Sequence, residues 1–379
     1  MQTAVKKIQM VDLVGQYEKI QQEIDKAIID VVRSAAFING PEVKAFQADL
    51  EKYLGVKHVI PCANGTDALQ IAMMALDLKP GDEVITADFT YVATAEVIAL
   101  LGLKPVLVDV YPGTFTLNIE EVKKAITPKT KAIVPVHLFG QCAEMDALMK
   151  LSAEHKLFVI EDTAQAIGAD YTYPDGKKVK AGTIGQIGCT SFFPSKNLGC
   201  YGDGGAMFTN DDELAKKMRM IANHGQSVQY YHDVVGVNSR LDSIQAAILR
   251  IKLRHLDEYA AARQKAAAFY DKAFANHPKI QIPARDKSST HVFHQYTLVL
   301  KGADRNKLKE HLATKEIPAM VYYPVPLHLQ KAYRDPRYKE GAFPITEHLC
   351  ASVISLPIHT ELTEEVQSHI VASVLEFLK

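Results

Sequence analysis

Lys196 stands in a stretch with little other charge, SFFPSKNLGCYGDGG, which covers residues 191–205. Two phenylalanines and a proline precede this lysine, and four glycines follow it. Glycines at this density mark tight turns or backbone pressed against other groups. A lysine in an apolar setting has a lowered pKa and becomes a nucleophile. The stretch therefore predicts a nucleophilic lysine, although an ordinary solvent-exposed lysine beside a glycine-rich loop fits the same pattern.

Three other segments carry groups that would complement such a lysine. They are Asp162 at the end of the apolar run LFVIED, Gly65 and Thr66 at the start of an amphipathic helix, and Tyr91 after the run EVITA. A buried carboxylate can keep a pyridine nitrogen protonated, the N–H groups of a helix start favour an anion, and an aromatic face can stack on a flat ring. Together with a lysine for a Schiff base, these are the requirements of pyridoxal 5'-phosphate (PLP). Taken singly, each group also fits a structural role, as a helix cap or a core aromatic.

The composition is that of an ordinary globular protein. The chain has 379 residues, 47% of them hydrophobic, and a formal net charge of −1. This length can bury a large core in two subdomains, and the absence of a basic field argues against nucleic-acid binding. The five cysteines are odd in number and lack paired short spacings, so neither a disulfide framework nor a zinc ribbon is expected. We expect a reducing, cytoplasmic location.

Membrane segments and several common site motifs are missing from the sequence. The N-terminal segment MQTAVKKIQMVDL has no apolar core of a leader peptide, and no apolar run is long enough to span a bilayer. No phosphate-binding GxxxxGK(S/T), HExxH or GxSxG motif occurs, and no GxGxxG follows a first strand. His291 and His294 are three residues apart in a strand-like context, where a core or surface role is expected. We therefore expect no bound metal.

The apolar pattern predicts alternating strands and helices in the first two thirds of the chain. Apolar residues recur at helical spacing from Asp12 to Phe37, and a second helix is expected near Pro41 to Leu54. Short apolar runs then alternate with amphipathic stretches, which predicts a mostly parallel sheet with helices on both faces. Ligands bind such sheets at the carboxyl ends of the strands. The runs are EVITA (83–87), PVLVDV (105–110), KAIVPV (131–136) and LFVIED (157–162).

The last part of the sequence predicts a second, smaller α/β domain. The segment from Leu241 to His277 is expected to form one long helix that bridges two lobes. A strand over 294–301, a helix near 306–314 and a closing helix follow it. We therefore expect a large domain over 1–250 and a small C-terminal domain over 251–379, with the N-terminal helix as a segment that can pack on the small domain.

Several segments together resemble the DegT/DnrJ/EryC1/StrS family of nucleotide-sugar aminotransferases. The resemblance spans nearly the whole chain, and the order of the segments is more specific than any single residue. It implies an α/β, fold type I PLP-dependent aminotransferase, whose large domain holds a mostly parallel seven-stranded sheet between helices. The segments are FINGPEV, CANGTDALQ, GDEVITADFTYVATAEVI, PVHLFGQ, VIEDTAQAIGA, TSFFPSKNLGCYGDGGAMFTND, NHGQ, VGVNSRLDSIQAA and YYPVPLHLQ.

The resemblance also implies roles for single residues. Lys196 matches the Schiff-base lysine of the family, Asp162 the partner of the pyridine nitrogen, and Gln165 the residue near the ring hydroxyl. Tyr91 matches the aromatic that stacks on the ring, and Asn238 a residue that reaches the phosphate from the neighbouring subunit. A homodimer with shared active sites is therefore implied. The phosphate contacts match Gly65, Thr66 and Ser191, and the candidates for substrate contacts are Arg240, Tyr322, Tyr323 and His328.

The implied reaction transfers an amino group from L-glutamate to a nucleotide-linked keto-sugar. Within the family, the sequence is most similar to enzymes that aminate C3 of UDP-2-acetamido-2-deoxy-3-oxo-glucuronate for surface polysaccharide such as lipopolysaccharide O-antigen. The alternative substrate is a 3-keto or 4-keto 6-deoxy sugar on dTDP, GDP or UDP. Many relatives carry an arginine just before Asn-His-Gly, but here Ala222 directly precedes Asn223. Composition and spacing therefore leave the sugar, the nucleotide and the partner of the diphosphate open.

Two rival functions were weighed against transamination. A dehydratase of the same family has a histidine at the lysine position, so Lys196 favours amination. A non-catalytic regulatory protein on the same fold would have no need for Lys196, Asp162, Gln165 and Ser191 together. Transamination is therefore the function that this sequence predicts.

Overall fold

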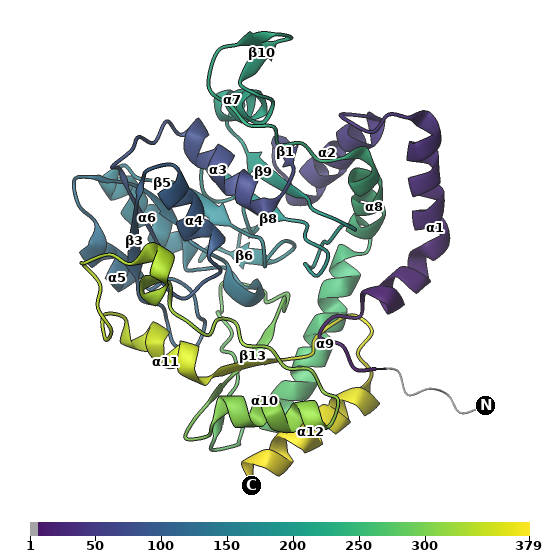
Figure 1. The fold of residues 1–379 in the computed structure, drawn as a ribbon, viewed down its shortest axis with the longest axis vertical. Helices are drawn as coiled ribbons and strands as arrows, with labels where there is room; N and C mark the ends of the chain where they lie inside the picture. The colour runs from purple at the N-terminus through teal and green to yellow at the C-terminus, as the bar shows by residue number, and fades with distance from the viewer. Residues whose placement is uncertain (1–6) are drawn as a thin grey trace.

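A seven-stranded sheet forms the centre of the protein, in a computed structural model that describes residues 7–379 (Figure 1). The first six residues of the N-terminal segment MQTAVKKIQMVDL, in which no leader peptide was predicted, lie outside this range. The strand order is β1-β9-β8-β5-β4-β2-β3, in which β8, β5, β4, β2 and β3 run parallel and β9 pairs antiparallel with both of its neighbours. The strands are β1 (His58–Cys62), β2 (Glu83–Ala87), β3 (Lys104–Val108), β4 (Thr130–Val134), β5 (Phe158–Asp162), β8 (Ile187–Ser191) and β9 (Gly205–Thr209).

Helices cover both faces of this sheet. Residues of α3 (Gly65–Ala75), α4 (Ala93–Leu100) and α7 (Asp212–Ala222) share one hydrophobic core with one face of the strands. The opposite face packs on α2 (Pro41–Leu54), α5 (Ile119–Ala125), α6 (Met145–His155) and α8 (Ser243–Leu253). Since both faces are buried, the strands consist of apolar runs rather than alternating apolar and polar residues. The predicted sheet, with helices on both faces, is confirmed.

A smaller three-stranded antiparallel sheet lies beside the long helix α9 (Leu256–Phe274), toward the C-terminal end of the chain (Figure 1). Its strands are β12 (Ile280–Gln281), β13 (Tyr296–Leu300) and β14 (Val353–Leu356). The helices α9, α10 (Arg305–Thr314) and α12 (Glu364–Leu378) pack on it and enclose a separate core. A nine-residue helix, α11 (Pro344–Ser352), directly precedes β14. The predicted strand over 294–301, the helix near 306–314 and the closing helix are confirmed, and the domain boundary at residue 250 stays a prediction.

The single long helix expected from Leu241 to His277 is wrong, because the chain breaks between α8 and α9. At the break, the N–H groups of Arg254 and His255 bond to carbonyls three residues back, which tightens the last turn of α8. The pair Asp257 and Glu258 then stands in the first turn of α9, where acidic side chains stabilise a helix start. That acidic pair is the sequence signal for the second helix.

The N-terminal helix α1 (Leu13–Ser34) lies within the predicted range 12–37, ends three residues before its limit, and packs mainly on α8. Its Ile20 and Ile24 contact Ile248 and Ile251 of that helix. Two short hairpins complete the fold, β6 (Asp170–Thr172) with β7 (Lys178–Lys180) and β10 (Gln226–Val228) with β11 (Tyr231–His232). None of the helices within residues 7–379 combines the length and apolar character needed to cross a bilayer.

Candidate active site

A cavity of about 520 Å³ opens at the carboxyl ends of β5 and β8. One wall comes from the start of α3 and the strand ends, and another from the segments before β13 and around residues 322–323. The cavity therefore lies where the chemistry-bearing residues were expected, beyond the strand ends of the parallel sheet. Nine predicted residues line it: Gly65, Thr66, Tyr91, Asp162, Gln165, Ser191, Lys196, Tyr322 and Tyr323.

Lys196 lies in a tight turn five residues after the end of β8. Its N–H bonds to the carbonyl of Phe193 at 2.8 Å, and the chain then folds back so closely that a Cβ on Gly199 would lie 2.3 Å from the carbonyl oxygen of Pro194. The turn holds the lysine half-buried at the cavity wall. Burial lowers the pKa of Lys196 to about 8, while the negative charge of Asp162 acts in the opposite direction. About a tenth of this amine is therefore unprotonated, and nucleophilic, at pH 7.

Asp162 is the last residue of β5, and its carboxylate is held by two donors. The Thr94 hydroxyl donates to Oδ2 at 3.1 Å, and the Ala164 N–H donates to Oδ1 at 3.1 Å. No helix follows Asp162, so the alternative role as a helix cap does not apply. Burial raises the pKa of Asp162, and the Ala164 N–H and the charge of Lys196 oppose that rise. The carboxylate can therefore share a proton with a basic nitrogen placed between it and the cavity.

Gln165 is fixed by hydrogen bonds at both ends of its amide. Its Oε1 accepts from the Phe139 N–H at 2.8 Å, and its Nε2 donates to the hydroxyl of Tyr323 at 3.1 Å. The ring of Tyr323 lies 6.0 Å from that of Tyr91, which is 56% exposed and borders the cavity. Tyr91 is thus free to place an aromatic face against a planar ligand.

The first turn of α3 and Ser191 form a cradle of donors at one end of the cavity. The side chain of Asn64 caps the helix by accepting from the Asp67 N–H at 2.8 Å. The N–H groups of Gly65 and Thr66 have no partner within the helix, because the first turn never provides one. A Cβ on Gly65 would lie 2.6 Å from that of Ser191, so only glycine allows this approach. Backbone N–H groups, two hydroxyls and the positive helix end meet here, which suits a phosphate.

Three predicted site residues lie outside this cavity. His328 is fully buried, and its ring nitrogens lie 2.6 Å from Asp88 and 3.2 Å from Glu347, so both are occupied by carboxylates. Arg240 lines a separate cavity of about 280 Å³. Asn238 is exposed and forms an isolated backbone bridge with Asn223. The structure of the chain therefore does not bring His328, Arg240 or Asn238 to Lys196.

A match to a known protein family indicates the class of reaction that this cavity serves. Residues 18–375 match the profile of the DegT/DnrJ/EryC1/StrS aminotransferase family. The chain belongs to the DegT/DnrJ/EryC1/StrS aminotransferase family. The fold type I architecture that the sequence resemblance implied is therefore confirmed, as is the dependence on PLP that this aminotransferase family shares.

Two relatives that are equally similar to this aminotransferase carry names of different kinds, one regulatory and one catalytic. A "Pleiotropic regulatory protein" from Geobacillus stearothermophilus is 47% identical over 98% of this chain and 99% of its own. A UDP-2-acetamido-2-deoxy-3-oxo-D-glucuronate aminotransferase from Pseudomonas aeruginosa is also 47% identical, over 94% of this chain and 96% of its own. Overall identity alone therefore does not separate a regulatory name from a catalytic one.

Two solved structures are similar to this aminotransferase over nearly all of its length. DesV from S. venezuelae, in complex with a ketimine intermediate, has a TM-score of 0.94 at 39% identity and covers 98% of this chain and 99% of its own. NtdA from Bacillus subtilis, with bound pyridoxamine phosphate (PMP), has a TM-score of 0.90 at 30% identity and covers 100% of this chain and 86% of its own.

The residues that line the cavity provide each kind of group that PLP needs. The cavity provides an amine with a lowered pKa, a buried carboxylate, an aromatic face and a cradle of donors for phosphate. No group of three or more His, Cys, Asp or Glu side chains in the described range is placed to hold a metal ion.

Sequence reasoning missed a buried histidine that lines the cavity near the lysine. His294 is buried and lines the cavity, its Nδ1 has no hydrogen-bond partner, and burial together with the charge of Lys196 holds its pKa well below the usual value. The sequence predicted only a core or surface role for it. Its position just before the apolar strand β13 was the available signal, because polar residues flanking strands often face a site. Other lining residues not predicted are Asn64, Leu69, Ala93, Val136, Ala164, Phe193, Ser195, Asp203 and Gln295.

Proposed function

We propose that this aminotransferase transfers the amino group of L-glutamate to C3 of a UDP-linked 3-oxo-glucuronate sugar. The observation that carries the proposal is the cavity that holds Lys196, Asp162 and the donor cradle of α3 together. The Pseudomonas aeruginosa relative, whose name states this substrate, supports the choice of sugar. Tyr322 and Tyr323, at the far wall of the cavity, are the proposed contacts for sugar hydroxyls.

Each side chain has a defined task in this reaction. Lys196 holds the cofactor covalently through Nζ, and after its release by the amino donor it takes the donor's α-proton. Its pKa of about 8 suits a base that must be partly unprotonated at neutral pH. The Thr94 hydroxyl and Ala164 N–H orient Asp162 toward the pyridine nitrogen. When bound, PLP supplies an electron sink that stabilises the negative charge left at the α-carbon.

A dimer with shared active sites is part of this proposal. Asn238 is exposed and does not line the cavity of its own subunit, and its backbone bridges to Asn223, three residues before β10. The β10–β11 hairpin projects from the body of the protein (Figure 1). The hairpin exposes Val228, Tyr230 and Tyr231 to between 65% and 79%. An exposed apolar hairpin of this kind is suited to an interface. We propose that it brings Asn238 to the phosphate end of the neighbouring cavity.

The regulatory name of one relative gives a second candidate, a protein on the same fold that senses a ligand without turning it over. Both candidates bind PLP, so a catalytic assay separates them. Purified protein is incubated with L-glutamate and a panel of UDP-, dTDP- and GDP-linked 3-keto and 4-keto sugars, and amino-sugar products are measured. The UDP-linked 3-oxo-glucuronate is expected to react best. Exclusive turnover of a 4-keto sugar contradicts the proposed substrate, and a bound yellow cofactor that glutamate does not change favours the regulatory candidate.

A further inference from the structure

Glu161 directly precedes Asp162 on β5, and its side chain points to the other face of the sheet. Successive side chains alternate along a strand, and here Val159 and Ile160 already pack in the two different cores of the sheet. Asp162 faces the cavity, whereas Glu161 is fully buried behind it. A buried carboxylate without donors would be costly, so the groups that surround it decide its role.

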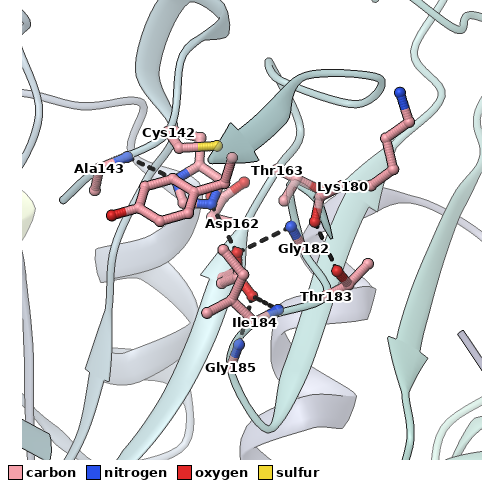
Figure 2. A network of polar contacts seen from close by, with 12 residues as sticks. Cys142, Ala143, Asp162, Thr163, Lys180, Gly182, Thr183, Ile184 and Gly185 are labelled. Atoms are coloured by element: carbon pink, nitrogen blue, oxygen red, sulfur yellow. Dashed lines mark hydrogen bonds and ion pairs between the residues drawn. The ribbon is translucent and has the colours of Figure 1, made fainter. Parts of the chain in front are cut away.

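Four donors converge on the two oxygens of Glu161. The N–H groups of Ile184 and Gly185 each donate to Oε1 at 2.6 Å, and the Gly182 N–H donates to Oε2 at 2.9 Å (Figure 2). The Nε2 atom of His137 lies 2.9 Å from the same Oε2. Both oxygens therefore accept two hydrogen bonds, which a carboxylate can do and an amide nitrogen cannot.

The tautomer of His137 follows from its second contact. Its Nδ1 lies 3.2 Å from the Ala143 N–H and must accept that hydrogen bond, so the proton is on Nε2 and points at Glu161. The histidine ring thus links the two ends of the loop of residues 137–143, through the hydrogen bond from the Ala143 N–H to Nδ1. The backbone at the start of the loop is also fixed, because the His137 N–H donates to the carbonyl oxygen of Asp162 at 3.0 Å.

This closed loop carries the donor that holds Gln165. Phe139, in the middle of the loop, has a positive φ of 59° and donates its N–H to the Gln165 Oε1 at 2.8 Å. The chain of contacts therefore runs from Glu161 through His137 to the loop and on to Gln165, while the same histidine's backbone touches Asp162. Packing alone does not require a charge here, because apolar side chains could fill the space without desolvating a carboxylate.

We propose that Glu161 and His137 form a buried positioning pair that holds Asp162 and Gln165 in place from the side of the sheet opposite the cofactor. Neither residue touches the cavity, so both act through the side chains that they orient. The inference rests on the cofactor site proposed above. Residues that orient a binding group matter because small displacements at such a site reduce binding and rate steeply.

The test compares how apo-protein variants bind PMP, which needs no covalent bond to Lys196. Glu161→Gln and His137→Leu are expected to weaken PMP binding at least about tenfold and to change the circular dichroism of PMP at saturation, which reports the tilt of the ring. His137→Gln retains an amide N–H that can donate to Glu161 and is expected to recover most of the affinity. Thermal unfolding of each apo variant measures the loss of stability separately.

Tyr270→Phe is the matched control, because it removes a buried hydrogen bond to the Pro357 carbonyl in the core of the smaller sheet, away from the cavity. It is expected to lower stability and leave PMP affinity and dichroism unchanged. Equal PMP affinity and dichroism in His137→Leu and wild type would overturn the proposal, as would losses in Tyr270→Phe that match those of His137→Leu. Asp162→Ala reports on the underlying site: if it binds PMP as wild type does, the cofactor site is wrong, and if it alone is impaired, only the positioning pair is wrong.

Discussion

Gly65 at the start of α3 and Ser191 at the end of β8 approach so closely that a Cβ on the glycine would lie 2.6 Å from the serine Cβ. The two residues are 126 positions apart in the sequence (191 − 65), yet together they form the cradle at one end of the cavity. The atoms that meet are a Cβ and backbone atoms of Ser191, which cannot move aside as the end of a flexible side chain could. The start of α3 can therefore lie this close to the end of β8 only because residue 65 has no side chain.

Gly65→Ala is expected to weaken PMP binding at least tenfold, which corresponds to about 1.4 kcal/mol. The added methyl group must push the start of α3 away from Ser191 and so separate the N–H donors from the hydroxyl. Titration of the apo protein with PMP measures the effect. Gly113→Ala is the control, because a Cβ there meets only a side-chain methyl of Ala284 at 3.1 Å, outside the cavity. Unchanged PMP affinity in Gly65→Ala would show that the phosphate binds elsewhere.

The rate at which apo protein captures PLP is expected to rise with pH through about 8, the pKa to which burial lowers that of Lys196. Only the unprotonated amine attacks the cofactor aldehyde, so the rate follows deprotonation of Nζ. The charge of Asp162 raises this pKa. Asp162→Asn removes that charge, and the midpoint is therefore expected to shift to lower pH. The measurement is the rate of appearance of the yellow colour after mixing, across a pH series. A midpoint that stays in place or moves upward in Asp162→Asn would contradict the coupling of the two groups.

His328→Leu is expected to lower the free energy of unfolding by about 3 kcal/mol, because it leaves the buried Oδ2 of Asp88 without its partner on the histidine ring. The side chains of His328 and Asp88 are both fully buried, and the His328 N–H also donates to Asp88 at 2.8 Å. Denaturant unfolding measures the change. In the catalytic assay, the KM for the nucleotide sugar is expected to stay at the wild-type value. By contrast, Tyr322→Ala, in the cavity wall, is expected to raise KM. A raised KM in His328→Leu at unchanged stability would restore its predicted role as a substrate contact.

The sequence predicted the parts of the site that depend on local order. Asp162 ends the predicted apolar run LFVIED and Gly65 opens a predicted helix, so their place at one edge of the sheet follows from the alternation of strands and helices. Ser191 was indicated only by the family resemblance, because no strand was predicted before it. The four predicted strand runs match β2, β3, β4 and β5 to within two residues at each end, and α2 matches at both ends, whereas α1 ends at Ser34, three residues before the predicted Phe37.

The residues that sequence reasoning misplaced or missed depend on contacts between distant segments. His294 reaches the cavity because the side chain of Asn197 donates to the Val292 carbonyl at 2.8 Å, a contact across 95 residues. The His328 side chain lies outside the expected substrate site because its ring binds the carboxylate of Asp88, 240 residues earlier in the sequence. Neither contact leaves a periodic pattern, and so neither can be derived from spacing alone.

Mixing two inactive variants is expected to restore activity if active sites are shared between subunits. Lys196→Ala removes the amine and Asn238→Ala the proposed phosphate contact, and each homodimer is then inactive. In a heterodimer, the intact Lys196 of one subunit meets the intact Asn238 of the other, so one of the two sites is complete. Random reassociation of equal amounts should give about one quarter of wild-type activity, since half of the dimers are mixed and each has one working site. The assay follows amino-sugar formation after the subunits are unfolded and refolded together. Mixing of Lys196→Ala with Asp162→Ala is the control, because both residues line the cavity of the same chain, so each cavity of the heterodimer lacks one of them and no activity is expected. No recovery in the Asn238 mixture, when wild-type protein refolded in the same way is active, would place Asn238 in its own subunit's site and contradict the shared arrangement.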